Sequence, residues 1–368
     1  MDRSLYTELA ERSLAGDLLE DALCVRLLED AQLELLPLLD AAYQVRRVHH
    51  GHKVSIHILN NAENGHCPED CAYCAQGRGS EAAIVDYGMK SEAEILAEAQ
   101  RAYAAGGHRY CMVFSGRGPS PRRIQQLCHL IKTIKARYPI EVCVSAGLVD
   151  AAGAQALKAA GLDRLNHNLN TSEDRYPQIC TTHSYQDRLD TLHHARSAGL
   201  EVCSGMIIGM GETAAEIIEV AKTLRSLGAE SIPVNFLVPI EGNALTYANE
   251  LTPTYCLRVL ALFRFLNPSA DIRAAAGREG HLRSMEVLCL YPANSLFLDG
   301  YLNTKGGDTQ RVLRMIQDAG FTIQSEIPLE DLLHQQNDSR ESFAVEGHQV
   351  QLKTDHDLKP SMQEEGTR

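Results

Sequence analysis

The sequence contains no long apolar run and no apolar signal core. No stretch of about 18 consecutive apolar residues occurs, so we expect no transmembrane helix. The first residues, MDRSLYTELAERSLAG, lack the hydrophobic segment that defines a secretory signal. We therefore expect a cytoplasmic protein that does not associate with membranes.

Basic residues are scarce relative to acidic ones. The chain has 35 Lys and Arg against 48 Asp and Glu, which gives a formal net charge of −13. Proteins that bind nucleic acid need a basic face to meet the phosphate backbone. The charge balance therefore argues against nucleic acid as a partner, and it disfavours anionic membrane surfaces for the same reason.

A second Cys-x2-Cys pair is also missing, although the chain has 11 cysteines. In a cytoplasmic protein this many cysteines indicates metal or redox chemistry rather than disulfides. Structural zinc sites use four ligands, commonly two separated pairs. The only close group here is Cys67, Cys71 and Cys74, in the run CPEDCAYC. His66 could supply a fourth zinc ligand, but its position next to Cys67 strains tetrahedral closure.

Three thiols can instead hold three corners of an iron–sulfur cubane and leave the fourth iron open. Cysteine thiolates are the usual ligands of such clusters. An aromatic residue, Tyr73, precedes the last cysteine. The C-x3-C-x2-C run with this aromatic residue resembles the cluster loop of the radical S-adenosylmethionine (SAM) superfamily. The resemblance implies a [4Fe–4S] cluster whose open iron binds SAM.

The rest of the chain alternates between strand-like and helix-like segments. Residues 1–48 carry apolar residues at helical spacing and predict an N-terminal helical extension. Residues 49–334 predict an α/β fold, a (β/α)8 barrel of the TIM type, because β-rich runs alternate with helical stretches. The polar tail 335–368 predicts disorder. The expected strands are 54–60, 109–116, 141–147, 164–170, 201–209, 231–239, 271–277 and 294–300.

Several of these strands carry polar residues on one face. Successive side chains on a strand point to opposite faces, so the apolar faces should pack on the helices and the polar faces should line the barrel. Ordinary barrel interiors are filled with bulky aliphatic residues. We therefore expect the lumen to hold a polar ligand or cofactor. The inward set is Arg109, Cys111, Ser115, Cys143, Ser145, Asn166, Asn168, Asn170, Asn235 and Arg273.

Cys111 and Cys143 of this set, together with Cys203 on the strand expected at 201–209, are placed early in their strands. Cys111, Cys143 and Cys203 should lie at similar depth, and they could converge on a second metal centre with Arg273 nearby. The alternative is that they are buried thiols that only pack, as free cysteines often do. The remaining cysteines are predicted to be structural: Cys24, Cys128, Cys180, Cys256 and Cys289.

Longer motifs resemble the biotin synthase family of radical SAM enzymes over about residues 40–325. These motifs are NAENGHCPEDCAYCAQ, RYCMVFSGRGPS, RLNHNLNTS, TTHSYQDRLDTL, EVCSGMIIGMGET, SIPVNFLVPIEGNAL and IRAAAGRE. The resemblance implies a homodimeric sulfurtransferase that inserts sulfur between C6 and C9 of dethiobiotin, with a flavodoxin- or ferredoxin-type electron donor.

The resemblance also implies roles for individual residues. Cys67, Cys71 and Cys74 would hold the [4Fe–4S] cluster, and Cys111, Cys143, Cys203 and Arg273 a [2Fe–2S] cluster that donates sulfur. Asn168 and Asn235 would bind dethiobiotin, whereas Tyr73, Arg188 and Ile207 would lie at the SAM site. Asn170 stands where some members of the family carry Asp. Two alternatives stay open: another radical SAM enzyme, of the hydrogenase-maturation or methylornithine synthase type, or a metal protein without catalysis.

Overall fold

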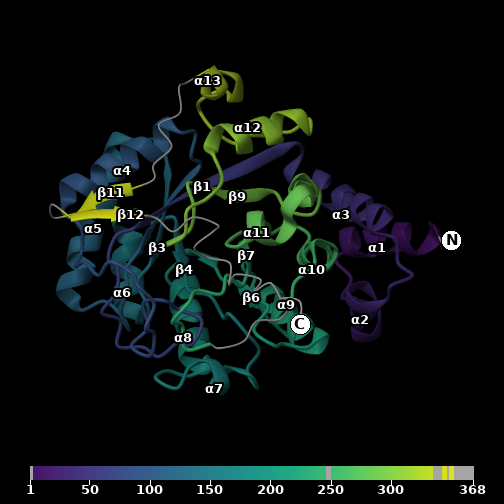
Figure 1. Ribbon diagram of the computed structural model, residues 1–368, viewed down its shortest axis with the longest axis horizontal. Coiled ribbons are helices and arrows are strands. Elements are labelled where there is room, and N and C mark those ends of the chain that lie inside the picture. Colours follow the sequence, from purple (N-terminus) through teal and green to yellow (C-terminus); the bar gives the residue numbers. More distant parts are fainter. Residues whose placement is uncertain (1–2, 246–249, 335–341, 346–347, 352–368) are drawn as a thin grey trace, which may run out of the picture.

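Parallel strands form a closed barrel at the centre of the molecule (Figure 1). The computed structural model describes residues 3–245, 250–334, 342–345 and 348–351. Strand β9 pairs with β1, which closes the barrel and confirms the predicted (β/α)8 fold. The barrel strands are β1 (Lys53–Asn61), β2 (Arg109–Val113), β3 (Glu141–Ser145), β4 (Arg164–Asn166), β5 (Glu201–Cys203) continued by β6 (Met206–Ile208), β7 (Ser231–Phe236), β8 (Asp271–Ala274) and β9 (Ser295–Leu298).

Helices connect the strands on the outside of the barrel. Three of them, α4, α8 and α9, begin with a capping box in which a Ser or Thr side chain and an acidic side chain satisfy the first backbone groups. The helices between strands are α4 (Glu92–Ala104), α5 (Pro121–Arg137), α6 (Ala151–Ala159), α7 (Tyr176–Ile179), α8 (Tyr185–Ser197), α9 (Ala214–Ser226), α10 (Pro253–Leu266), α11 (Arg278–Leu282) and the 3-10 helix η1 (Arg283–Leu290). None of the helices in the described ranges is long and apolar enough to cross a membrane.

The fifth barrel strand is interrupted between β5 and β6. Gly205 lies in the break, and a Cβ atom there would come within 1.9 Å of the carbonyl oxygen of Pro233. Only glycine allows the backbone to approach β7 so closely. The side chain of Asn168 accepts a hydrogen bond from the Gly205 amide at 3.1 Å. The break therefore brings β6 and Asn168 together at one end of the barrel.

The N-terminal helices cover one side of the barrel. Helices α1 (Arg3–Ala15), α2 (Asp21–Glu29) and α3 (Leu35–His50) lie beside α10, as Figure 1 shows. The predicted helical character of residues 1–48 is confirmed for the described part from Arg3 onward. Because these helices cover it, α10 is buried from Cys256 to Leu266. Arg258 on α10 donates to the carbonyl oxygens of Leu27, Asp30 and Leu33 at 3.0, 2.8 and 2.6 Å.

We expect Arg258→Met to lower the free energy of unfolding by about 2–4 kcal/mol, because it leaves buried carbonyl groups without donors. Urea unfolding followed by circular dichroism measures the loss. Arg26→Met is the matched control, because Arg26 is exposed and makes only a 3.5 Å ion pair with Asp30; its effect should stay within about 0.5 kcal/mol. Equal effects of the two variants would contradict the conclusion that Arg258 holds α10 to the N-terminal helices.

The chain after the barrel forms short elements. Helix α12 (Thr309–Asp318) leads to β10 (Thr322–Ile323), which pairs with β1, and then to α13 (Leu329–His334). Within the tail that the sequence predicts to be disordered, the described residues form an antiparallel pair, β11 (Ser342–Val345) and β12 (His348–Gln351). Their alternating Phe343, Val345 and Val350 favour strands. Residues 335–341, 346–347 and 352–368 lie outside the described residues.

Candidate active site

The three clustered cysteines lie in the segment between β1 and α4. The amide of Cys74 donates to the carbonyl oxygen of Cys71 at 2.9 Å, which closes a turn. The amide of Ala72 donates to the carbonyl oxygen of Ile179 at 2.9 Å and ties the loop to α7. All three thiols are free and partly exposed. Such a loop offers accessible, uncommitted thiol ligands at the carboxyl ends of the strands, where barrel enzymes place their active sites.

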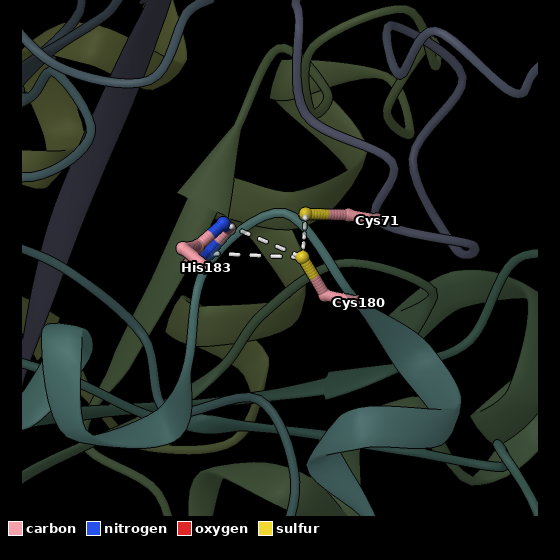
Figure 2. A group of neighbouring side chains, drawn as sticks. All are labelled: Cys71, Cys180 and His183. Atoms are coloured by element: carbon pink, nitrogen blue, oxygen red, sulfur yellow. Dashed lines mark hydrogen bonds between the residues drawn. The ribbon is translucent and has the colours of Figure 1, made fainter.

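A cavity opens beside this loop. It is lined by two of the clustered cysteines and by most of the predicted ligand-binding residues: Cys67, Tyr73, Cys74, Asn168, Arg188, Ile207 and Asn235. Cys71 does not line it; its thiol lies beside the thiol of Cys180 and the imidazole of His183 instead (Figure 2). The structure therefore brings several separate segments of the chain together around one cavity, whereas Cys71 of the triplet lies outside its lining.

The asparagines of the cavity are held by backbone groups. The side-chain oxygen of Asn235 accepts from the amide of Ala276 at 3.2 Å, and its Nδ2 donates to the carbonyl oxygen of Met206 at 3.3 Å. Asn168 is fixed by the Gly205 amide. These contacts orient both side-chain amides. A polar ring with its own donors and acceptors is the kind of ligand that such oriented amides recognise.

Strand alternation does not extend through the whole segment 164–170. Strand β4 ends at Asn166, and beyond it His167 and Asn168 both line the cavity. The Nε2 atom of His167 is buried without a hydrogen-bond partner among the described residues. Asn170 has a φ of 70°, a left-handed conformation that Asn tolerates, and it donates to the hydroxyl of Tyr73. Sequence reasoning missed His167 because it assumed a longer strand.

Arg188 connects the cavity to the cysteine loop. Its guanidinium donates to the carbonyl oxygen of Asn168 at 2.6 Å and to Nε2 of His183 at 2.9 Å. The Nη2 atom of Arg188, which bonds His183, also lies 4.0 Å from the thiol of Cys71. Arg188 is 6% exposed. A buried positive charge beside a thiol and a cavity favours anionic groups on the ligand that enters.

A second group of cysteines lies inside the barrel. Cys111 and Cys143 are direct partners in the pairing of β2 with β3, and Cys203 lies on β5. Their exposed fractions are 7%, 3% and 1%. The hydrogen bond with Cys111, together with burial, raises the pKa of Cys143 to about 12. The hydrogen bond from Cys143, opposed by burial and helped by Arg273, lowers the pKa of Cys111. Cys143 is hydrogen-bonded to both Cys111 and Cys203, so the three thiols lie together inside the barrel.

Arg273 lies beside this thiol group. Its Nη1 is 3.9 Å from the sulfur of Cys203, and its Nη2 donates to Ser231 at 2.7 Å and contacts His57 at 3.1 Å. Although burial opposes it, the hydrogen bond with His57 and the charge of Arg273 hold the pKa of Asp271 well below its usual range. The Nε atom of Arg273 has no hydrogen-bond partner in the described part of the chain.

The donor sets fit the groups that the resemblance implies. Three buried thiols and a guanidinium with an unpaired buried nitrogen fit an anionic iron–sulfur cluster inside the barrel, because the arginine charge offsets the charge of thiolates and sulfides. At the edge of the cavity, three free thiols on one loop fit a cluster with an open position. His66 does not join them: its side chain is 76% exposed and lies 4.0 Å from Asp86. This position gives no support to His66 as a fourth zinc ligand.

The remaining cysteines divide into two groups. Cys24, Cys256 and Cys289 are buried in the apolar core, and Cys128 donates to the carbonyl oxygen of Ala156 at 3.4 Å. These four agree with a structural role. Cys180 differs, because its thiol contacts Cys71 rather than only apolar side chains. The spacing Cys180-x2-His183 was the one sequence signal that could have singled it out.

Two family models match the chain. The Radical SAM superfamily matches residues 64–224, and the Biotin and Thiamin Synthesis associated domain matches residues 233–322. A biotin synthase of Magnetococcus marinus is 60% identical over 292 residues, which is 79% of this chain and 91% of the relative. A biotin synthase of Bacillus licheniformis is 44% identical over 320 residues, 87% of this chain and 96% of the relative.

The chain belongs to the biotin synthase family. This confirms the resemblance seen in its motifs, and membership of the radical SAM superfamily implies a [4Fe–4S] cluster and SAM. The structure of methylornithine synthase superposes with a TM-score of 0.74 at 21% identity, covering 88% of this chain and 98% of that one. The hydrogenase maturase HydG of Carboxydothermus hydrogenoformans gives 0.72 at 17% identity, covering 89% and 81%. These likenesses show a shared fold.

Proposed function

We propose that this chain is a radical SAM sulfurtransferase that inserts sulfur between C6 and C9 of dethiobiotin to give biotin. The observation that carries the proposal is that the barrel holds two separate sets of three cysteines. The cavity extends from the set on the cysteine loop toward the set inside the barrel. Asn166 lines the cavity and donates to the sulfur of Cys203 at 3.2 Å. The interior thiols therefore lie next to the part of the cavity that Asn166 lines.

Cys67, Cys71 and Cys74 would hold the [4Fe–4S] cluster, and Cys111, Cys143, Cys203 and Arg273 the [2Fe–2S] cluster. When bound, the first group with SAM supplies the adenosyl radical, and the second supplies sulfur. The protein's own part is to orient the reactants and exclude water.

Arg188, Tyr73 and Ile207 line one part of the cavity and form the proposed SAM site. The buried guanidinium of Arg188 offers a charge for a carboxylate, and Ile207 offers an apolar surface for an adenine ring. Asn168 and Asn235 line the cavity with oriented amides, which suits the donors and acceptors of the ureido ring of dethiobiotin. Between them they place the substrate next to the interior thiols.

Asn235→Ala should raise the dethiobiotin concentration needed for half-maximal biotin formation by about one to two orders of magnitude, because a lost buried hydrogen-bond partner costs about 1–3 kcal/mol. The measurement is the concentration of dethiobiotin for half-maximal biotin formation. Asn267→Ala is the control: this amide is equally buried but donates to the carbonyl oxygens of Ala221 and Phe263. An unchanged substrate dependence in Asn235→Ala would remove Asn235 from the substrate site.

The direct test of the function is product analysis by mass spectrometry. The reconstituted protein is incubated anaerobically with SAM, a reductant and dethiobiotin, and biotin is the expected product. Iron analysis should give about six irons per chain, four from one cluster and two from the other. Formation of 5′-deoxyadenosine without biotin would indicate a different radical SAM reaction, of the type that the structural neighbours catalyse.

Two further features of the proposal come from the family. The electron donor is a small flavodoxin- or ferredoxin-type protein, and the chain forms a homodimer. Sedimentation of the reconstituted protein tests the second point, and activity with a purified flavodoxin and its reductase tests the first.

A further inference from the structure

Cys71, Cys180 and His183 form a compact group (Figure 2). The sulfur atoms of the two cysteines lie 3.7 Å apart. The sulfur of Cys180 lies 3.4 Å from Nδ1 and 4.0 Å from Nε2 of His183. The three potential ligand atoms all lie within 4.8 Å of one another. Cys180 and His183 come from the segment that joins α7 to α8, whereas Cys71 comes from the cysteine loop.

These separations match the edges of a tetrahedral metal site. With metal–sulfur bonds of about 2.3 Å and metal–nitrogen bonds of about 2.0–2.1 Å, tetrahedral ligands stand about 3.8 Å apart for two sulfurs and about 3.5 Å apart for sulfur and nitrogen. The observed 3.7 Å between the sulfurs agrees with the first value, and the 4.0 Å from Cys180 to Nε2 of His183 exceeds the second by about 0.5 Å. A single ion could therefore bind with little movement of the three side chains.

Neighbouring groups set the imidazole in the state that a metal needs. The Nδ1 atom of His183 lies against the carboxylate of Glu69, which accepts a hydrogen bond from it. The Nε2 atom faces a guanidinium N–H of Arg188 at 2.9 Å and must therefore carry the lone pair. A carboxylate behind a metal-binding histidine is the usual arrangement that fixes its tautomer. In the metal-free protein this lone pair accepts from Arg188, so a metal can bind at Nε2 only when that guanidinium turns away.

A carboxylate also lies next to Cys180. The carboxylate of Asp70 lies 3.3 Å from the sulfur of Cys180. It is held by the backbone amides of Thr181 and Thr182 at 2.9 and 3.2 Å. The bonds that hold Asp70 leave two thiols and an imidazole as the available ligands, a set typical of zinc and of other thiophilic divalent ions with one open position.

We propose that, in the chain without its clusters, Cys71, Cys180 and His183 bind one thiophilic divalent ion and leave the fourth position to solvent. Binding replaces the two thiol protons by two metal–sulfur bonds and releases both protons to solvent. The site shares Cys71 with the proposed [4Fe–4S] ligands, and to that extent it rests on the proposed function. Because one thiolate cannot serve both, the single ion and the cubane exclude each other.

Cobalt(II) is the probe for this site, because thiolate ligation gives it an intense near-ultraviolet charge-transfer band. Reduced protein, freed of iron and sulfide, is titrated anaerobically with Co²⁺. We expect one equivalent to bind with the intensity of two thiolates. Cys180→Ala and Cys180→Ser should each lose about half of that intensity. Glu69→Gln should lower the affinity about 10- to 100-fold, as for other residues that support a metal-binding histidine.

Cys67→Ala and Cys74→Ala are the matched controls, because these thiols belong to the same loop but lie outside the proposed site. Both should bind Co²⁺ as the wild type does, although neither should hold the cubane. Loss of the cobalt spectrum in these two variants, with retention in Cys180→Ala, would overturn the proposal by placing the ion in the triplet. Circular dichroism of each variant checks that it is folded.

Competition separates this proposal from the proposed function. Protein loaded with Zn²⁺ should take up iron and sulfide at the triplet more slowly than metal-free protein, and Cys180→Ala should show no such delay. If wild-type protein binds no Co²⁺ yet assembles both clusters and forms biotin, the single-ion site is wrong and the function stands. If Co²⁺ binds as expected but no cubane forms under any condition, the function is wrong and the site stands.

Discussion

Cys143→Ala should abolish biotin formation while leaving the [4Fe–4S] cluster and SAM cleavage in place. Cys143 is paired with Cys111 across β2 and β3, and it lies inside the barrel, 3% exposed. The cysteine loop between β1 and α4 is a separate part of the chain, so its three thiols are unaffected. Removing one thiol from the interior group leaves the sulfur-donating cluster with an incomplete ligand set.

Mössbauer spectra and biotin yield on the same sample measure this outcome, and 5′-deoxyadenosine reports the retained chemistry. Cys256→Ala is the matched control, because Cys256 is a fully buried thiol on α10 that packs in the apolar core. It should cost about 1–2 kcal/mol of stability, as a small cavity does, and still form biotin. A retained [2Fe–2S] signal with normal biotin yield in Cys143→Ala would sink the two-cluster assignment.

The barrel itself could be predicted because its strands and helices follow different hydrophobic periods. Alternation along β2 and β3 placed Cys111 and Cys143 on the inner face, and their direct pairing shows that equal positions on neighbouring parallel strands do lie at equal depth. The inward Arg273 was predicted by the same reasoning on β8. Here the local pattern and the tertiary structure agree, so reading the sequence was sufficient.

The same reasoning failed where a strand is shorter than its β-rich run. β4 stops at Asn166, and the following backbone turns so that His167 and Asn168 both reach the cavity. Side-chain direction in such a segment depends on hydrogen bonds with a distant partner, here the Gly205 amide. No local periodicity encodes that contact.

The surroundings of individual ligands were the hardest to predict. Cys71 and Cys180 are 109 residues apart in sequence, and their contact depends on how α7 packs against the cysteine loop. The same holds for the charged residues near the interior thiols, where His57, Arg164 and Arg273 all contact the carboxylate of Asp271. Motifs identify the ligands of a cluster, whereas the fold determines which charged groups and thiols contact those ligands.

Cys71→Ala should abolish SAM cleavage altogether. Two thiols cannot hold a cubane with one defined open iron. The neighbouring Cys180 is a poor substitute because it comes from the segment between α7 and α8 rather than from the cysteine loop, and His183 and Asp70 hold its thiol there. Anaerobic assay of 5′-deoxyadenosine after reconstitution measures the loss. Cys180→Ala is the control for disturbance of this corner: it removes the adjacent thiol, keeps all three triplet ligands and should keep producing 5′-deoxyadenosine. Wild-type amounts of 5′-deoxyadenosine from Cys71→Ala would show that Cys71 is not a cluster ligand, whereas equal loss in both variants would show that Cys180 is required as well.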